Sequence, residues 1–239
     1  MKQIHLTQID STNLYLERHL NECPDLCSVR SDIQTAGMGR LSRHWDSGEG
    51  GLWFSLLFQS GVLLPSQLQK ICGLSALHEL INLSGKEDFG LKWPNDIYYQ
   101  AGKISGCLQK NFLTNQHTSC IIGIGINVNN PIPQTLRTKA VNLKTIMGME
   151  IDLEPLYQRI LDRIQQQYTH FSKEELEADY QSHSILKPGI IVRVHDIVND
   201  RVYTGAVSNY PDETLEIDTR QGQHLSFRAA DVTLKSWQY

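Results

Sequence analysis

Hydrophobic and polar positions follow two different spacings along the chain, and these predict strands interleaved with helices. Short runs rich in apolar and β-branched residues predict strands. The nearly unbroken run LWFSLLF is typical of a strand that is covered on both faces. The expected strands are Gln3–Ile9, Cys27–Asp32, Leu52–Phe58, Leu91–Trp93, Ile97–Tyr99, Ile104–Phe112 and Cys120–Val128.

Apolar residues three and four positions apart predict the helices between these strands. The expected helices are Thr12–Leu20, Pro65–Leu83, Leu153–Phe171 and a short helix around Leu176 and Tyr180. Asp10 or Ser11 can cap the first helix, Gly85 can end the second, and Ser172 with Glu175 can form a capping box for the last. The second helix should bury one stripe, made of Leu68, Ile71, Leu74, Leu77 and Ile81. The third should bury Leu156, Ile160, Ile164 and Phe171.

The pattern changes at residues 186–189 (LKPG). Only short strand-like stretches separated by turn residues follow: IIVRV, VYTGAV, TLEID, HLSFR and DVTL. This succession predicts a small β-barrel. We therefore expect one domain over residues 1–185 and a second, small domain over residues 186–239.

Composition excludes several classes of protein. Apolar residues make up 40% of the chain and the formal net charge is -4, which disfavours DNA or RNA as a partner. The five cysteines form no CxxC pair, so we expect reduced, mostly buried thiols in a cytoplasmic protein. The nine histidines are scattered and no metal-binding triad is apparent. No signal peptide or membrane span is expected.

The loop over residues 34–45 (QTAGMGRLSRHW) carries the first candidate site. Gly37 and Gly39 allow close approach of the backbone to a ligand, and their N–H groups can face an anion. Arg40 and Arg43 can bind phosphate or carboxylate, and Trp45 offers a flat face for stacking. A solvated loop with incidental charges is the alternative for this segment alone.

Three further segments contain residues suited to a nucleotide or an acyl group. In residues 91–97 (LKWPNDI), a proline-fixed turn presents Lys92, Asn95 and Asp96, and Asp96 could hold Mg²⁺ on a triphosphate. An ordinary tight turn is an equally good interpretation of this segment. Residues 102–106 (GKISG) present Lys103, whose compact charge suits an acyl oxygen or an α-phosphate. In residues 123–129 (GIGINVN), glycines mark a close approach and Asn127 can contact an adenine edge.

Together, in this order, these segments resemble the biotin protein ligase family. The matching pieces are Ser11-Thr12-Asn13 after the first strand, QTAGMGR…W, KWPND, GKISG and GIGINVN, which span roughly residues 8–130. The resemblance implies an α+β fold: a mixed sheet flanked by helices, like the catalytic core of class II synthetases, with a small C-terminal SH3-like β domain. It also implies the short form of the family, which lacks an N-terminal DNA-binding domain.

The resemblance further implies residue roles. Biotin would be bound by Ser11, Thr12, Asn13, Gln34, Gly37 and Lys103. ATP would be bound by Arg40, Arg43, Trp45, Lys92, Asn95, Asp96 and Asn127. The residues expected to act in catalysis are Lys103, Arg40, Arg43 and Asp96, the last also as a Mg²⁺ ligand.

The implied reaction activates biotin with ATP to biotinyl-5′-AMP and transfers biotin to a lysine of a biotin carboxyl carrier domain, that of acetyl-CoA carboxylase or a related carboxylase. No tightly bound prosthetic group is expected, and a homodimer is left open. We also expect residues 36–48 to be mobile without ligand and to fold over it. The alternatives are a lipoate or octanoyl ligase-like acyltransferase and a catalytically weak biotin-binding paralogue.

Three departures from the family pattern bear on these roles. Met38 stands where the family loop usually has its first arginine, and Leu41-Ser42 stands in place of a basic residue and a glycine. Lys110 lies where the strand after Lys103 usually ends in an acidic residue. The loop therefore has less positive charge and less glycine freedom than usual.

Overall fold

The computed structural model describes residues 1–94, 96–113, 118–211 and 214–238. Its internal contacts divide the chain into two compact units. The first comprises Met1–Leu91 and Asn95–His183, and the second comprises Lys92–Pro94 and Ser184–Tyr239.

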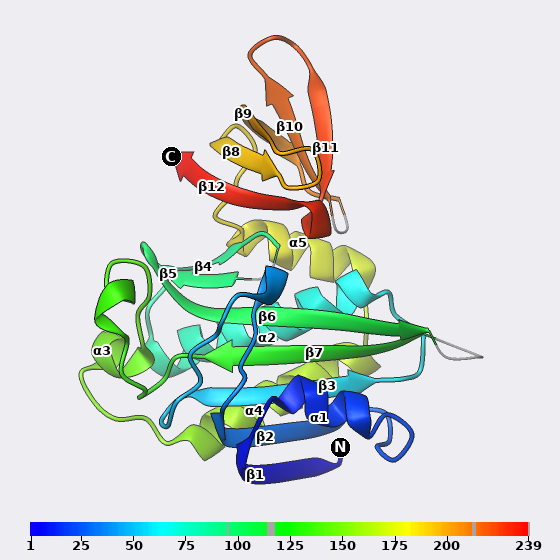
Figure 1. Cartoon of the computed structure of the whole chain (residues 1–239), viewed down its shortest axis with the longest axis vertical. Helices are drawn as coiled ribbons and strands as arrows, with labels where there is room; N and C mark the ends of the chain where they lie inside the picture. Colours follow the sequence, from blue (N-terminus) through cyan, green and yellow to red (C-terminus); the bar gives the residue numbers. More distant parts are fainter. Residues whose placement is uncertain (95, 114–117, 212–213, 239) are drawn as a thin grey trace. The chain divides into compact units, whose positions relative to one another are not determined.

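The first unit is built on a seven-stranded mixed sheet (Figure 1). The strands are β1 (Gln3–Ile9), β2 (Cys27–Gln34), β3 (Leu52–Phe58), β4 (Phe89–Lys92), β5 (Asp96–Tyr99), β6 (Gly102–Leu113) and β7 (Thr118–Ile126). Their order across the sheet is β1-β2-β3-β7-β6-β5-β4. β1 and β2 run parallel, whereas β2, β3, β7, β6 and β5 pair antiparallel. This mixed sheet flanked by helices confirms the predicted fold class.

Helices cover both faces of this sheet. The helices of the first unit are α1 (Thr12–Arg18), α2 (Pro65–Ser84), α3 (Leu143–Met147), α4 (Leu153–Thr169) and α5 (Lys173–His183). Ser55 of β3 bonds to α1, whereas its neighbour Phe54 packs edge-on against Tyr157 of α4, with ring centroids 5.2 Å apart. Since adjacent residues of a strand point to opposite faces, α1 and α4 lie on opposite sides of the sheet.

The helix α2 is buried on more than one side, which differs from the single stripe expected. Its core includes Leu68, Ile71, Leu74 and Leu77 as predicted, but Leu80 is buried and Ile81 only half-buried. Glu79, on another side of the helix, is also buried and pairs with Arg163 of α4 at 2.7 Å. The reason is that α2 packs against α4 and α5 as well as against the strands β5, β6 and β7. Gly85 ends α2 in a left-handed conformation, as predicted.

The other helix ends lie close to the predicted positions. α1 stops at Arg18 and α4 stops at Thr169, so Phe171 lies beyond the helix and is only half-buried. Ser172 Oγ accepts a hydrogen bond from the backbone N–H of Glu175 at 3.3 Å near the start of α5. α3 was not expected from the sequence.

The second unit is an antiparallel five-stranded sheet, consistent with the SH3-like domain expected. Its strands are β8 (Ile191–Asp196), β9 (Arg201–Asn209), β10 (Thr214–Thr219), β11 (His224–Arg228) and β12 (Val232–Gln238). They follow the order β11-β10-β9-β8-β12. The core includes Val192, Val194, Val207, Leu215, Ile217 and Val232.

All five cysteines are free and buried, as the sequence led us to expect. Burial raises the pKa of Cys27 and of Cys107 to about 12. Among the described residues, no helix has the length and apolar character needed to cross a membrane.

Candidate functional site

A row of residues that includes two glycines crosses the face of the first sheet that carries α1. Trp53 of β3 lies opposite Gly125 of β7, and Gly125 lies opposite Gly106 of β6. Gly106 in turn lies opposite Asp96 of β5. Without side chains at the two glycines, other groups can approach the backbone of β6 and β7 closely on this face.

An irregularity in β6 turns Lys103 onto the same face. Ile97 of β5 pairs with Ser105, whereas the next residue, Tyr98, pairs with Lys103. Ile104 therefore has no partner in the register and is one extra residue on β6. A bulge of this kind shifts the alternation of side chains by one position. Lys103 therefore points to the side of the sheet that carries Asp96 and the two glycines.

Lys103 and Asp96 form an ion pair over Gly106. Lys103 Nζ lies 2.6 Å from Asp96 Oδ1, and the two side chains keep 27% and 19% of their surface exposed. A Cβ atom at Gly106 would lie 3.1 Å from Lys103 Nζ and 3.2 Å from Asp96 Oδ1. Gly106 thus provides the space for the pair. Burial, and then the negative charge of Asp96, raise the pKa of the neighbouring Tyr98 to about 12.

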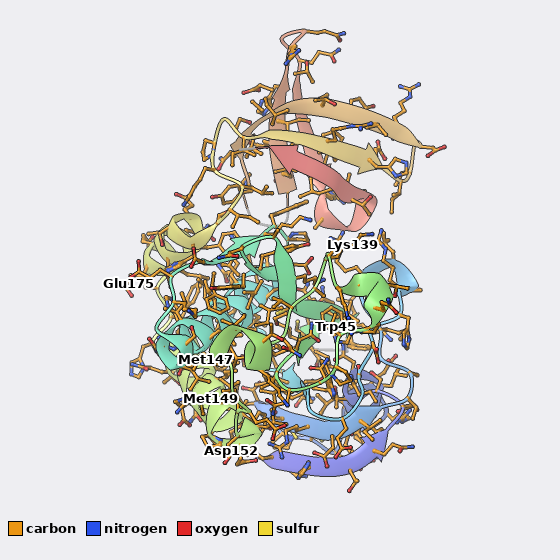
Figure 2. All side chains as sticks on the ribbon, turned by 90° about the vertical axis from the view of Figure 1, so that its left-hand side faces the viewer. Trp45, Lys139, Met147, Met149, Asp152 and Glu175 are labelled. Carbon is orange, nitrogen blue, oxygen red and sulfur yellow. The ribbon has the colours of Figure 1, made fainter. Side chains whose placement is uncertain are left out.

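The indole of Trp45, labelled in Figure 2, packs directly on Gly125. A Cβ atom at Gly125 would lie 2.7 Å from Trp45 Nε1. The Trp45 ring also faces the ammonium of Lys103, with Nζ 4.9 Å from the ring centroid, and meets Trp53 edge-on at 6.5 Å. A cation at this distance from an indole is attracted to its face. Trp45 therefore lies on the glycine row beside Lys103.

The loop that delivers Trp45 is fastened by backbone hydrogen bonds. Gly39 N–H donates to the Arg43 carbonyl at 2.8 Å, and Trp45 N–H donates to the Gly37 carbonyl at 2.9 Å. A Cβ atom at Gly37 would lie 2.4 Å from Ser47 Oγ and 2.5 Å from the Trp45 carbonyl oxygen. Glycine at position 37 is thus required for the loop to fold back on itself.

Arg40 lies half-buried in this loop, whereas Arg43 is exposed. Burial lowers the pKa of Arg40, the nearby charge of Asp96 opposes this effect, and Arg43 adds to it. Leu41 and Ser42 both adopt left-handed backbone conformations, with φ of 56° and 55°. Since such conformations are costly for residues other than glycine, the two departures from the family loop strain it.

Buried polar groups form a second cluster where α1 meets the sheet. Gln34 Oε1 accepts hydrogen bonds from Thr12 N–H at 2.9 Å and from Thr12 Oγ1 at 3.1 Å. Thr12 Oγ1 also contacts Ser55 Oγ at 2.6 Å, and Ser55 donates to Asn13 Oδ1. Asn13 lies on Gly123 of β7, where a Cβ atom would come within 2.2 Å of its Oδ1. A second glycine of the GIGINVN segment thus makes room for this cluster.

The same cluster extends to the loop and to Ser11. Gln34 Nε2 donates to Ser47 Oγ at 3.0 Å, which ties the cluster to the end of the loop. Ser11 is the N-cap of α1 and is buried, but its side chain does not cap the helix. Among the described residues, the hydroxyl of Ser11 has no hydrogen-bond partner. It therefore remains available to a ligand.

Two of the predicted ATP contacts, Lys92 and Asn127, lie at strand ends, and a third lies outside the described residues. Asn127 follows β7 and is buried, and its Oδ1 accepts a hydrogen bond from Asn130 Nδ2 at 3.1 Å. Lys92 is the last residue of β4 and is partly exposed. Asn95 lies outside the described residues. The structure therefore does not place Lys92 or Asn95 in the site.

The structure brings the remaining predicted residues together on one face of the sheet. Gly123 beneath Asn13 and Gly125 beneath Trp45 are two positions apart on β7, or about 7 Å. The polar cluster and the Lys103–Asp96 pair therefore lie along a single strip of strand backbone.

Sequence reasoning missed Ser55 and Ser47. Ser55 was the only polar residue in an otherwise apolar strand, which was a usable signal. Ser47 lies in a polar loop that gave no such signal.

Comparisons with known proteins agree on one family. The model of the biotin/lipoate A/B protein ligase family matches residues 6–127, about half of the chain. A solved structure of a biotin protein ligase from Aquifex aeolicus in complex with biotin and ATP matches with a TM-score of 0.82 and 30% sequence identity. This match covers 98% of each chain.

Curated relatives match over a shorter part. The bifunctional ligase/repressor BirA of Bacillus subtilis is 36% identical over 161 residues, which is 63% of this chain and 48% of BirA. A biotin–[acetyl-CoA-carboxylase] ligase of Paracoccus denitrificans is 30% identical over 131 residues, 52% of this chain and 53% of that protein. The chain thus spans about half the length of the curated relatives it matches. The resemblance found in the sequence is confirmed: this chain belongs to the biotin/lipoate A/B protein ligase family.

Proposed function

We propose that this protein is a biotin protein ligase, which activates biotin with ATP to biotinyl-5′-AMP and transfers it to a lysine of a carrier domain. One observation carries the proposal. A buried hydrogen-bonding cluster around Thr12 and the ammonium of Lys103 lie on one strip of glycine-rich backbone. A ligand with a compact polar ring at one end and a carboxylate at the other matches this arrangement. The Aquifex relative binds biotin and ATP in its solved structure.

The biotin ring belongs at the polar cluster. Ser11, Thr12, Asn13 and Gln34 would surround it, with Gly37 in the same wall. The hydroxyl of Ser11 and the second N–H of the Gln34 amide can still bond to a ligand, because Gln34 uses one amide N–H for Ser47. Both kinds of group suit a ring that carries N–H donors and a carbonyl acceptor.

The reacting anions belong at the cationic end. Lys103 would contact the biotin carboxylate and the α-phosphate, and Arg40 and Arg43 would gather the phosphates. An ammonium has three donors, so Lys103 can keep Asp96 as a partner and still bond to a ligand. The positive charges weaken the repulsion between the carboxylate and the triphosphate, which is the main barrier to their approach.

Two steps follow from these positions. A carboxylate oxygen of biotin attacks the α-phosphorus, the bond to the β-phosphate oxygen breaks, and pyrophosphate leaves with that electron pair. In the second step, the neutral amine of the carrier lysine attacks the acyl carbon of the anhydride. AMP leaves as a phosphate anion, and the nitrogen loses a proton as the amide forms. Lys103 stays near the negative charge throughout.

Trp45 and Asn127 would bind the adenine of ATP. Trp45 would stack on the base, and the Asn127 amide N–H, which has no partner among the described residues, would donate to its edge. Lys92, Asn95 and Asp96 would support the ATP end of the site. These roles stay proposals.

A resident Mg²⁺ ion does not fit the donor set around Asp96. The Asp96 carboxylate already carries the Lys103 ammonium at 2.6 Å, and the positive charge of Arg40 is near. Mg²⁺ is usually bound by one or two carboxylates together with substrate phosphates and several waters, and the Asp96 oxygen that faces Lys103 is already paired. We therefore derive no step through an ion held by Asp96. Any Mg²⁺ would enter as part of the ATP complex.

The proposed partner is a biotin carboxyl carrier domain of acetyl-CoA carboxylase or a related carboxylase. The name of the Paracoccus relative supports this assignment. DNA is not a proposed partner, since the net charge is -4. A homodimer through an edge strand stays a prediction.

We further propose a catalytic domain over residues 1–185 and a small SH3-like domain over residues 186–239. The division of the described contacts at Ser184 supports this boundary. Five free, buried thiols support a reducing compartment, the cytoplasm.

Transfer of labelled biotin to a purified carrier domain tests the function. The protein with ATP should label the carrier, and omission of ATP should abolish labelling. A carrier whose target lysine is replaced by arginine should also remain unlabelled. Binding of biotin without ATP-dependent labelling would instead identify a catalytically weak paralogue.

The lipoate alternative is separated by competition. In an ATP–pyrophosphate exchange assay, biotin should support exchange and excess lipoate should not reduce it. Exchange supported by lipoate and not by biotin would assign this chain to the other branch of its family.

A further inference from the structure

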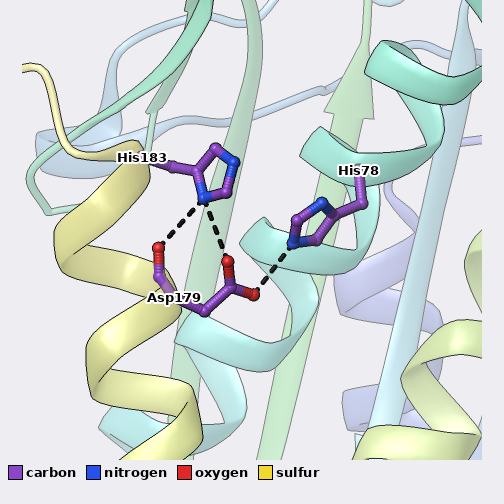
Figure 3. Close-up of side chains that lie close together, drawn as sticks. All are labelled: His78, Asp179 and His183. Carbon is purple, nitrogen blue, oxygen red and sulfur yellow. Dashed lines mark hydrogen bonds and ion pairs between the residues drawn. The ribbon is translucent and has the colours of Figure 1, made fainter.

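Two histidines and one aspartate meet where α2 and α5 pack together (Figure 3). His78 Nε2 lies 2.8 Å from Asp179 Oδ2, and His183 Nδ1 lies 3.0 Å from Asp179 Oδ1. The three ligand atoms all lie within 4.8 Å of one another. Among the described residues, no other group of three or more histidines, cysteines or acidic residues is this compact.

This cluster is separate from the proposed biotin site. α2 contacts β6 and β7 on the face of the sheet opposite to α1 (Figure 1), so the cluster lies across the sheet from Lys103. None of the three residues has a role in the proposed ligase reaction. We propose that His78, Asp179 and His183 bind one transition-metal ion of the zinc type, with water completing the coordination.

The present hydrogen bonds show how an ion would enter. Asp179 Oδ2 is hydrogen-bonded to His78 Nε2, whereas His183 Nδ1 lies 3.0 Å from Asp179 Oδ1 and is hydrogen-bonded to the Asp179 carbonyl oxygen. One divalent ion can take the place of these contacts, bound by the Asp179 carboxylate and by the two ring nitrogens that face it. Each ring would then carry its proton on the other nitrogen, and Figure 3 shows both of these nitrogens pointing away from Asp179. Neither has a hydrogen-bond partner among the described residues, so both can hold that proton in solvent.

The distances require only small movements. Ligand atoms around a tetrahedral zinc ion lie about 3.3 Å apart, given bonds of about 2.0 Å. The two contacts to Asp179 are slightly shorter than this separation. Asp179 and His183 are four residues apart on α5 and therefore share one helix face. His183 Nδ1 would give up its contacts with the Asp179 carbonyl and with Ser182 Oγ.

The chemistry and exposure of the ligands favour zinc over magnesium or calcium. Two imidazoles and one carboxylate suit zinc and related transition metals, whereas the alkaline-earth ions prefer oxygen ligands. The three side chains keep 24%, 28% and 29% of their surface exposed, which leaves access for a water ligand. Such a three-ligand site keeps one coordination position open.

The ion would join two helices that are far apart in the sequence. His78 and Asp179 are 101 residues apart, and His183 is the last residue of the first unit. The same helix pair is also held by Lys70 and Glu177, with Nζ 2.7 Å from Glu177 Oε2. α5 therefore keeps a contact with α2 when the histidines are replaced, and the variants can be tested as folded proteins.

Zinc affinity of the whole, chelator-stripped chain tests the proposal. Titration of Zn²⁺ against a chromophoric chelator should show one tight site. His78→Ala and His183→Ala should each weaken it by at least about 100-fold, because each removes a direct ligand. His224→Ala is the matched control: its ring contacts Asp218 at 2.7 Å, without a second histidine. It should leave the affinity unchanged.

Asp179→Asn keeps the shape of the cluster while removing its charge, so it provides a second test if a histidine variant unfolds. Co²⁺ in the wild-type chain should give the visible absorption of four-coordinate cobalt, and Asp179→Asn should lose it. Failure of the wild-type chain to bind Zn²⁺, or unchanged affinity in folded His78→Ala and His183→Ala, would overturn the proposal. None of these readouts depends on ligase activity.

Discussion

Glycine residues at positions 106, 123 and 125 determine which groups can share the functional face. Each sits beneath a polar or aromatic side chain that a Cβ atom would displace: the Lys103–Asp96 pair, Asn13 and Trp45, respectively. Side chains of ordinary size would separate these groups from the strand backbone. The glycines therefore act by allowing close approach, and the chemistry belongs to the residues above them.

Replacement of Gly125 by alanine tests this role of glycine. The new Cβ atom would lie 2.7 Å from Trp45 Nε1, so the indole must shift from its position beside Lys103. If Trp45 stacks on adenine, we expect kcat/KM for ATP in pyrophosphate exchange to fall by about 10- to 100-fold. Gly48→Ala is the control, because a Cβ atom there has no neighbour within 4 Å. Equal activity of the two variants would argue against the placement of Trp45.

The buried hydroxyl of Ser55 gives a second prediction at this scale. Ser55→Ala would leave Asn13 Oδ1 and Thr12 Oγ1 without one hydrogen-bond partner each. The free energy of unfolding should fall by about 1–3 kcal/mol, since unmet buried polar groups are costly. Ser119 is equally buried but its hydroxyl has no partner among the described residues, so Ser119→Ala should cost little. Urea unfolding of both variants measures the difference, and equal losses would contradict this account.

At the scale of elements, the site depends on a strand irregularity and on a loop. The predicted strands and helices match the observed ones to within a few residues, because apolar periodicity reports burial directly. The bulge at Ile104 could not be predicted in this way. Regular alternation would place Lys103 and Ser105 on one face and Gly106 on the other. In the observed register, Lys103 lies instead on the same face as Gly106. Only the pairing of β6 with β5 shows this.

The apolar periodicity of the sequence also could not predict that α2 is buried on several sides. The pattern indicated the stripe that faces the sheet, but α4 and α5 cover another side of the helix with contacts such as Glu79 with Arg163. Those partners lie more than 80 residues away in the sequence. The cluster of His78, Asp179 and His183 could not be predicted from the sequence for the same reason, because the two histidines become neighbours only after folding.

The loop over residues 36–48 is predicted to close over the ligands. In the described structure, Met38 and Leu41 each keep 45% of their surface exposed, and Arg43 is exposed as well. Closure would cover these residues and exclude water from the reactive anhydride. Cleavage by trypsin after Arg40 and Arg43 should therefore slow at least about tenfold with biotin and ATP present.

Arg220 provides the internal control for this experiment, because it is exposed in the turn between β10 and β11. Its cleavage should proceed at the same rate with and without ligands. If the ligands left cleavage at Arg40 and Arg43 unchanged, loop closure would be excluded.

At the scale of the whole molecule, the two faces of the first sheet have separate tasks. The face that carries α1 presents the polar cluster, the glycine strip and the Lys103–Asp96 pair. The opposite face is closed by α2 and α4, with buried contacts such as Phe54 against Tyr157. A rigid, well-packed back face holds the strands whose backbone forms the site. The family and the fold class followed from the order of short motifs. The same motifs supplied most residues of the candidate site, whereas the spatial arrangement of those residues required the strand register.

The central claim is that Lys103 lets the biotin carboxylate react with ATP, and biotin-dependent ATP–pyrophosphate exchange tests it most directly. Lys110 provides the matched control, because it lies on the same strand and is also paired with an acidic residue, Glu17. We predict that Lys103→Ala lowers the exchange rate by at least about 100-fold while Lys110→Ala retains it. Both variants should unfold at similar urea concentrations. Wild-type exchange by a folded Lys103→Ala variant would contradict the account.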